Sequence, residues 1–168
     1  MTTITMPSPL GLLRLHADAG ALTAVQLPGE DAPPAIAGDE AADGAGEPIL
    51  RDAARQLAEY FAGERREFAL PLAPRGTEFQ QRVWRALIAI PFGATRSYGE
   101  QARAIGRPSA SRAVGAANGQ NPIAIIVPCH RVIGASGALT GYAGGLAAKR
   151  WLLAHEARFT PAVQTSWV

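Results

Sequence analysis

The chain has 168 residues, 48% of them hydrophobic, which is enough for a packed core in one ordinary domain or two small ones. No apolar run is long enough to cross a bilayer, and residues 1–10 lack the basic and apolar segments of a signal peptide. We therefore expect a cytoplasmic protein without membrane contact. The single cysteine, Cys129, excludes an internal disulfide and a thiolate zinc site.

The net charge of +2 hides an uneven distribution along the chain. Residues 1–50 carry one Arg and seven Asp or Glu, whereas residues 51–168 carry fifteen Lys or Arg and seven Asp or Glu, so the two parts have charges of −6 and +8. A basic half fits a polyanion such as nucleic acid, although scattered arginines also keep protein surfaces soluble. Charge alone therefore leaves the partner open.

Residues 2–27 are predicted to form a small antiparallel meander. Apolar and polar residues alternate along this stretch, and turn signals interrupt it at residues 7–11 and 18–20. Residues 28–48 are rich in Gly, Ala, Pro, Asp and Glu and show no apolar periodicity. We expect a flexible acidic loop there, because such a composition buries too little apolar surface to become ordered.

A helix is predicted to cover the meander. Residues 49–61 place their apolar side chains on one helical face, and Gly63 follows where a helix can stop. Two prolines then keep residues 68–75 extended, before the composition turns basic. We therefore expect a supporting N-terminal domain of residues 1–75, with the domain boundary near Arg75.

The second half, residues 76–168, is predicted to be mostly helical. Thr77 is placed to cap a helix that ends before Pro91. Two shorter helices are expected over residues 98–105 and from Ser109 onward, with a tight Gly-Arg-Pro turn between them. This is the pattern of a helix-turn-helix, although most short helical pairs have no DNA partner.

The expected fold class is α+β. It combines a small N-terminal antiparallel sheet and its helix with a mostly helical, winged-helix-like C-terminal domain that contains the helix-turn-helix. The glycine-rich stretch of residues 134–145 lacks the Lys-Ser/Thr pair of a phosphate-binding loop, so no nucleotide cofactor is expected.

A reactive thiol is predicted where an apolar run ends. Residues 123–127 indicate a buried strand, and Cys129, His130 and Arg131 follow it after one proline. An imidazole and a guanidinium beside a thiol favour the thiolate by taking its proton or by holding its charge. Adjacent side chains on an extended backbone point apart, so His130 is expected to reach Cys129 only at a bend or through a water.

Glu156 is a candidate partner for His130, because a nucleophile needs a base and the base needs a group that orients it. Two plainer alternatives stay open for these residues. Cys129 can be a structural cysteine, which composition alone favours, since unpaired cysteines are among the most buried residues. Glu156 can be a solvated carboxylate at the end of a helix.

Four motifs of the second half occur together in a known family. They are Asn121-Pro122, Val127-Pro128-Cys129-His130-Arg131-Val132-Ile133, Gly141-Tyr142-Ala143-Gly144-Gly145-Leu146 and Trp151-Leu152-Leu153-Ala154-His155-Glu156. Because of these motifs, the chain resembles the bacterial members of the O6-alkylguanine-DNA alkyltransferase family. The resemblance covers nearly the whole second half, whereas residues 1–75 match only in their general plan of strands and helix.

What the resemblance implies is a DNA repair reaction that reverses the damage directly. The alkyl group of O6-alkylguanine moves irreversibly to Cys129, each molecule acts once, and no cofactor or metal takes part. His130 activates Cys129 through a water, and Glu156 holds His130. Tyr98 gives a proton to the departing guanine, and Asn121 is the hinge between the recognition helix and the active-site segment.

The resemblance also implies a partner, double-stranded DNA that contains O6-alkylguanine. The damaged nucleotide is rotated out of the stack, and Arg112 of the recognition helix fills the gap. Ala113 and Gly115 let this helix lie close to the minor groove, with Ser111 and Tyr98 in the same DNA contact. We expect a monomer in solution, while cooperative assembly on DNA and activity on O4-alkylthymine stay open.

Five residues are expected to line the substrate pocket. They are Val132, Tyr142, Ala143, Gly144 and Ala124. By the same resemblance, the backbone carbonyls of Val132 and Cys129 accept hydrogen bonds from the guanine amine. Ala124 stands where several relatives carry a proline that packs on the alkyl group, which leaves the preferred alkyl size open. The chain lacks the zinc ligands of some eukaryotic members, which argues against a structural metal.

Two other functional classes stay open. A non-reactive module would recognise alkylated DNA with the same fold, although such modules replace the acceptor cysteine that this chain retains as Cys129. A cysteine hydrolase would use Cys129 and His130 on an acyl substrate, would need an oxyanion site and would turn over repeatedly. Burst-and-stop kinetics would exclude the hydrolase.

Overall fold

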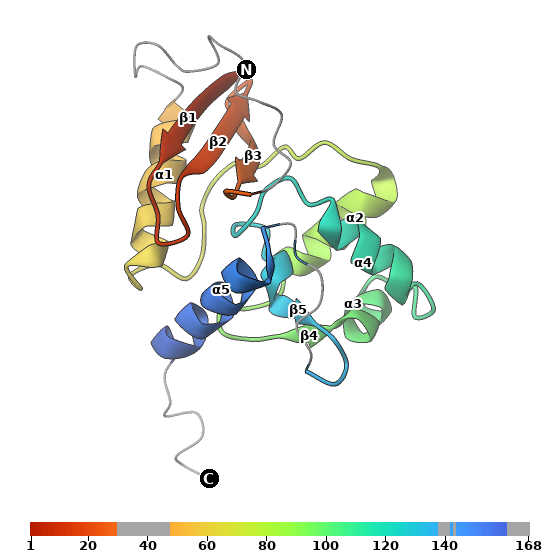
Figure 1. The fold of residues 1–168 in the computed structure, drawn as a ribbon. Helices are drawn as coiled ribbons and strands as arrows, with labels where there is room; N and C mark the ends of the chain where they lie inside the picture. The colour runs from red at the N-terminus through yellow and green to blue at the C-terminus, as the bar shows by residue number, and fades with distance from the viewer. Residues whose placement is uncertain (30–47, 138–141, 143, 161–168) are drawn as a thin grey trace.

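The N-terminal residues form a three-stranded antiparallel sheet, which confirms the predicted meander. The computed structural model describes residues 1–29, 48–137, 142 and 144–160. Its first strands pair in the order β1-β2-β3 (Figure 1); they are β1 (Thr2–Met6), β2 (Leu13–Asp18) and β3 (Ala21–Gln26). Every second residue of β2 is fully buried, so the alternating pattern places one face of the sheet against the core.

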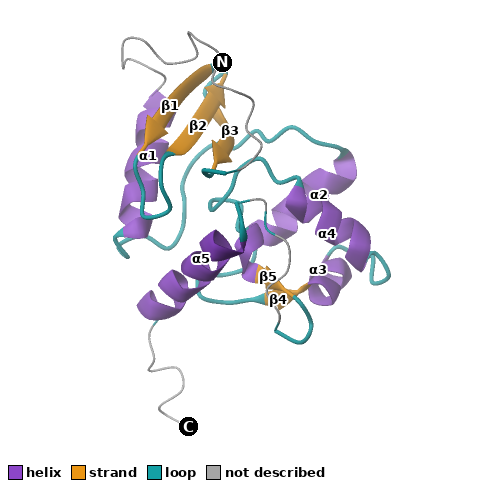
Figure 2. Ribbon diagram, in the orientation of Figure 1, coloured by secondary structure: helices purple, strands orange, loops and turns teal. Residues whose placement is uncertain are grey.

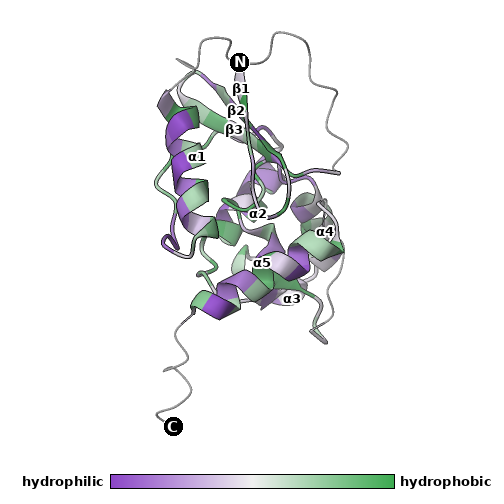
Figure 3. Cartoon of the chain, turned by 60° about the vertical axis from the view of Figure 1, so that its left-hand side comes forward, coloured by the Kyte–Doolittle hydropathy of each residue, from purple (hydrophilic) through white to green (hydrophobic). Residues whose placement is uncertain are grey.

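Helix α1 (Pro48–Phe61) covers this sheet, as predicted. Figure 3 shows hydrophobic and hydrophilic residues alternating along α1 beside the strands. The helix stops at Gly63, whose φ of +79° suits glycine and whose N–H donates to the carbonyl of Tyr60 at 3.0 Å. Most of the acidic loop predicted at residues 28–48 lies outside the described residues.

The segment after α1 is an extended connection that stays attached to the sheet. The N–H of Leu22 donates to the carbonyl of Pro71 at 2.9 Å, and the N–H of Ala73 donates to the carbonyl of Leu22 at 2.8 Å. Leu72 thus makes one parallel bridge to β3. The prolines restrict the segment to extended backbone, as the sequence predicts.

Helix α2 (Glu78–Ile88) begins at the predicted cap. The hydroxyl of Thr77 accepts from the N–H of Gln80 at 3.1 Å, and the side chain of Gln80 accepts from the N–H of Thr77 at 2.9 Å, which completes a capping box. The buried indole of Trp84 donates to the carbonyl of Ala117 at 2.9 Å. Helix α2 is therefore tied to the helix-turn-helix.

The helix-turn-helix consists of α3 (Tyr98–Ala104) and α4 (Ser111–Gly119), which lie side by side in Figure 1. The second helix starts at Ser111, not at Ser109 as predicted, because the N–H of Ala110 donates to the carbonyl of Arg107 and closes a separate turn first. Gln101 and Asn118 exchange two buried amide hydrogen bonds, of 2.9 and 3.0 Å, that hold α3 against α4.

The apolar run of residues 123–127 is not a strand, which corrects the prediction. The N–H of Ile126 donates to the carbonyl of Ala124 and that of Val127 to the carbonyl of Ile123, while Ile125 has a φ of +72°. Figure 2 accordingly draws loop after α4. All five side chains are buried. Because all five side chains are buried, the segment is apolar throughout, and its hydrophobic pattern has the periodicity of neither a strand nor a helix.

Four short or C-terminal elements complete the described fold. The short helix η1 (Cys129–Arg131) leads into β5 (Val132–Ile133), which pairs in parallel with β4 (Arg96–Ser97). Helix α5 (Leu146–Phe159) packs against η1. No helix in the described part of the chain is long and apolar enough to cross a membrane.

Candidate active site

Cys129 opens the 3-10 turn of η1 and is half-buried. The amide nitrogen of Asn121 donates to the carbonyl of Val127 at 2.8 Å and lies 3.2 Å from the sulfur of Cys129. The amide oxygen of Asn121 accepts from the N–H of Ile123 at 3.0 Å. One side chain thus holds both ends of the loop and presents an N–H to the sulfur, which favours the thiolate.

His130 lies in the same turn and is fully buried. Its Nε2 is 2.7 Å from Oε2 of Glu156 on α5, a residue 26 positions later in the chain. The predicted pairing of His130 with Glu156 is therefore a contact in the structure. The plainer alternative of a solvated carboxylate is wrong, since Glu156 is 1% exposed.

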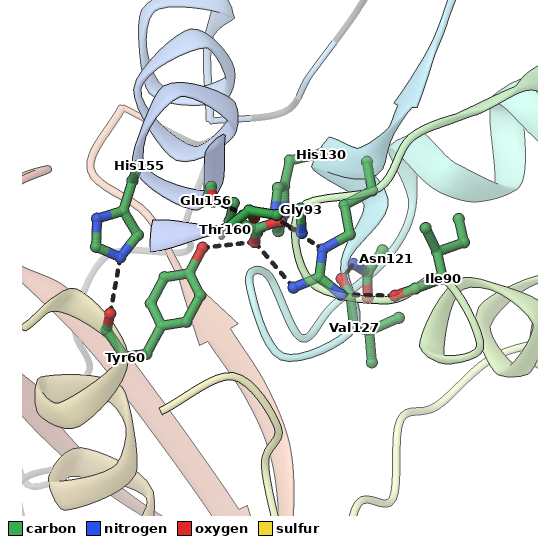
Figure 4. A network of polar contacts seen from close by, with 10 residues as sticks. Tyr60, Ile90, Gly93, Asn121, Val127, His130, His155, Glu156 and Thr160 are labelled. Carbon is green, nitrogen blue, oxygen red and sulfur yellow. Dashed lines mark hydrogen bonds and ion pairs between the residues drawn. The ribbon is translucent and has the colours of Figure 1, made fainter. Parts of the chain in front are cut away.

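The carboxylate of Glu156 is the centre of a buried polar network (Figure 4). Oε1 accepts from Nε of Arg131 at 2.7 Å and from the N–H of Gly93 at 3.1 Å. Oε2 accepts from His130, from the hydroxyl of Tyr60 at 2.7 Å and from Nη2 of Arg131 at 2.9 Å. The third guanidinium nitrogen, Nη1 of Arg131, donates to the carbonyl of Ile90 at 2.7 Å.

This network determines the protonation states of Glu156 and His130. Burial alone raises the pKa of Glu156, but the hydrogen bonds from His130 and Arg131 outweigh it and hold that pKa well below its ordinary value. Burial lowers the pKa of His130, and Glu156 offsets this only in part. An ionised carboxylate only accepts, so neutral His130 carries its proton on Nε2. Its buried Nδ1 is then an acceptor, and it has no hydrogen-bond partner among the described residues.

Lys149 is a residue of the site that the sequence analysis missed. Lys149 is 1% exposed, and its ammonium donates to the carbonyl of Val132 at 2.6 Å. Burial lowers the pKa of Lys149, and the charge of Cys129 acts in the opposite direction, so the cation and the sulfur are coupled. The spacing of Lys149, Leu152 and Glu156 could have indicated this, because it places all three residues on one face of α5.

The parallel pairing of β4 with β5 places Tyr98 next to the segment that follows Cys129. Tyr98 follows β4 directly, and Ser97 pairs with Ile133, four residues beyond Cys129. The half-buried ring of Tyr98 lies against Gly115 of α4, where a Cβ would be 3.7 Å from the ring. Tyr98 and α4 are therefore neighbours.

The other predicted DNA-contact residues lie at the start of α4. Arg112 and Ala113 are exposed, and Ser111 and Gly115 are half-buried. Val114, between them in sequence, is fully buried. The helix thus presents Arg112 and Ala113 on its outer side while Val114 anchors it in the core.

The predicted pocket residues are only partly described. Tyr142 and Gly144 are half-buried, a Cβ at Gly144 would overlap the Leu27 side chain, and Ala143 lies outside the described residues. The carbonyl of Val132 is already bonded to Lys149, and that of Cys129 accepts from the N–H of Val132. A carbonyl oxygen has two lone pairs, so each retains capacity for one more donor.

The backbone N–H of Ala124 makes a hydrogen bond that a proline at this position could not make. Its N–H donates to the carbonyl of Val25 at 3.1 Å, and the N–H of Val25 donates to the carbonyl of Pro122 at 2.9 Å. These bonds tie the active-site loop to β3. Proline lacks an N–H and would lose the first of them.

Two domain families together match most of the chain. Residues 1–74 match "6-O-methylguanine DNA methyltransferase, ribonuclease-like domain", and residues 78–158 match "6-O-methylguanine DNA methyltransferase, DNA binding domain". The chain belongs to the 6-O-methylguanine DNA methyltransferase family. The resemblance drawn from the sequence motifs is thereby confirmed.

Relatives within this family are similar over two thirds or more of their own length. The methylated-DNA--protein-cysteine methyltransferase of Mycolicibacterium paratuberculosis is 54% identical over 161 residues, which cover 96% of this chain and 95% of that protein. The protein of the same name from Methanosarcina acetivorans is 65% identical over 107 residues, which cover 64% of this chain and 69% of that protein.

A solved structure of the family has the same fold. The crystal structure of Mycobacterium tuberculosis OGT in complex with DNA is 50% identical, covers 100% of both chains and has a TM-score of 0.85. A structure described as Mycobacterium tuberculosis O6-methylguanine methyltransferase is 51% identical, covers 99% of both chains and has a TM-score of 0.86. The expected α+β fold, with an N-terminal sheet and a helical C-terminal part, is confirmed.

Proposed function

We propose that this protein is a methylated-DNA--protein-cysteine methyltransferase, which takes the alkyl group from O6 of guanine in DNA onto Cys129. The observation that carries the proposal is the arrangement around Cys129. A half-buried thiol stands on a 3-10 turn beside a buried imidazole, and Glu156 holds that imidazole at 2.7 Å. Membership in the methyltransferase family supports the same reaction class.

The proposed chemistry is a displacement at a saturated carbon. The thiolate of Cys129 forms a carbon–sulfur bond while the bond from the alkyl carbon to guanine O6 breaks, and the electron pair stays on the guanine. The proton of the thiol passes through a water to Nδ1 of His130. Tyr98 gives a proton to a ring nitrogen of the guanine and regains one from solvent. The sulfur needs no metal because a thiolate is already a strong nucleophile.

The product makes the reaction stoichiometric. A thioether at Cys129 resists hydrolysis, so each molecule is expected to act once. A cysteine hydrolase would instead form a thioester, which water cleaves and which permits repeated turnover.

The proposed partner is duplex DNA in which the damaged nucleotide has been flipped out. Rotation from the stack costs roughly a few kcal/mol, and Arg112 at the exposed start of α4 fills the gap. Residues 76–168 bind DNA and accept the alkyl group, and residues 1–75 support them. We further propose that the protein acts as a monomer in the cytoplasm.

Exchange of Arg112 for Ala is expected to slow transfer from duplex DNA by about 10- to 100-fold, because the gap in the stack is no longer filled. Reaction with the alkylated base alone is expected to keep its rate. Single-turnover rates on the two substrates measure the difference. Arg51→Ala on α1 is the charge-matched control, since Arg51 is also exposed and lies on the helix that covers the sheet. Equal slowing on both substrates would remove the base-flipping role.

The proposed function is tested by the intact mass of the protein after incubation with duplex DNA that contains O6-methylguanine. Addition of one methyl group, mapped by peptide analysis to Cys129 and followed by no further turnover, is the expected result. An unchanged mass together with tight binding of the lesion would identify a non-reactive recognition module. An unchanged mass with the DNA, together with repeated turnover of an acyl ester in a parallel assay, would identify a hydrolase.

A further inference from the structure

Tyr60 reaches the site from the other half of the chain. It belongs to α1, is fully buried, and donates its hydroxyl hydrogen to Oε2 of Glu156 at 2.7 Å, across 96 positions of sequence (Figure 4). The centroid of its ring lies 5.6 Å from the ring centroid of Phe68 and 5.0 Å from that of His155. His155 also donates from Nε2 to the carbonyl of Tyr60 at 2.7 Å, which fixes the end of α1 against α5.

More hydrogen-bond donors contact Glu156 than a carboxylate has lone-pair positions to accept them. A carboxylate offers about four lone-pair positions, whereas the described residues make five contacts of 2.7 to 3.1 Å with Glu156. Three of the five fall on Oε2, from Tyr60, His130 and Arg131. Donors that share one oxygen compete, so the hydroxyl of Tyr60 limits how strongly Oε2 attracts the proton of His130.

We propose that Tyr60 is a positioning residue for the transfer reaction, whose hydroxyl shares the charge of Glu156 and so keeps His130 neutral, with its proton on Nε2 and its Nδ1 ready to accept. The proposal rests on the function proposed above. It gives residues 1–75 a chemical role, because among the described donors to Glu156 only Tyr60 comes from that part of the chain.

The charges around His130 explain why one hydroxyl matters. Glu156 on α5 favours the imidazolium, whereas Arg131 on η1 and Lys149 on α5 oppose it. The charge of Cys129 in turn raises the pKa of Lys149 and so favours its ammonium form. In this buried setting a lost hydrogen bond is not replaced by bulk water, so its effect passes to the remaining partners. Without the hydroxyl, Glu156 would attract the His130 proton more strongly, and the pKa of His130 would rise.

Tyr60→Phe tests this with the loss of a single oxygen atom. NMR titration of the His130 ring nitrogens, in the full-length wild type and the variant, measures the pKa and the tautomer directly. The pKa of His130 is expected to rise by about one unit in the variant, within the range seen for loss of a hydrogen bond to a charged group. The acidic limb of the rate of alkyl transfer against pH is expected to move upward with it.

Phe68→Leu is the matched control, because it loosens the packing on the Tyr60 ring and leaves the hydroxyl in place. It should lower thermal stability and leave the titration of His130 unchanged. An unchanged His130 titration in Tyr60→Phe, or the same shift in both variants, would reduce Tyr60 to a structural role and overturn the proposal. If the wild type transfers no alkyl group, the proposed function fails, and the NMR titration still decides whether Tyr60 controls His130.

Discussion

Replacement of Cys129 by Ala is expected to abolish alkyl transfer while affinity for duplex DNA stays largely unchanged. The sulfur is the atom that forms the new bond, whereas the proposed DNA contacts lie on α4, starting at Ser111. Because Cys129 is half-buried at the start of η1, loss of its sulfur removes little buried surface and should leave the fold intact. The chain has no second cysteine to take over the reaction.

Two measurements check this expectation. Single-turnover assays with O6-methylguanine in duplex DNA follow transfer, and fluorescence anisotropy with the same duplex follows binding. Cys129→Ser is the informative companion, since its hydroxyl still faces the Asn121 amide but ionises far less readily than a thiol. Transfer that persists in the Ala variant would show that another residue is the acceptor, and a parallel loss of binding would show that the thiol also holds the DNA.

Glu156→Gln is expected to lower the free energy of unfolding by about 3–5 kcal/mol and to slow transfer by roughly 10²- to 10⁴-fold. The first effect follows because Arg131 is only 5% exposed and its guanidinium would be left without its carboxylate. The second follows because a neutral amide does not fix the tautomer of His130 as an ionised carboxylate does, which weakens general-base catalysis. Urea unfolding and single-turnover rates measure the two effects.

A double variant separates stability from catalysis. Adding Arg131→Met to Glu156→Gln removes the unpaired buried charge, so most of the lost stability should return. The rate of transfer should stay low, because His130 still lacks its carboxylate partner. If the rate recovered along with the stability, Glu156 would act only through the fold.

The packing of α1 against α5 suggests how residues 1–75 support the second half. The guanidinium of Arg66 donates to the carbonyl of Phe159 at 2.7 Å, and His155 donates to the carbonyl of Tyr60 at the same distance. A Cβ at Gly63 would overlap the ring of Phe159. Gly63 therefore serves the contact between the halves as well as the end of α1.

Local sequence signals determined much of this fold. The alternation of residues 2–27 produced the meander, and the Thr77 cap produced the start of α2, since each depends on neighbours within a few positions. The motif around Cys129 identified the thiol and its neighbour His130. These features need no knowledge of distant residues, so the sequence alone carries them.

Tertiary structure decided the shape of the loop and the surroundings of the site. Residues 123–127 fold as turns because burial on every side leaves no period from which to infer their backbone. Nothing local to Glu156 indicates that Arg131, 25 residues earlier, and Tyr60, 96 residues earlier, donate to it. The protonation of His130 depends on burial and on these distant partners, which come together only when α1, η1 and α5 pack against one another.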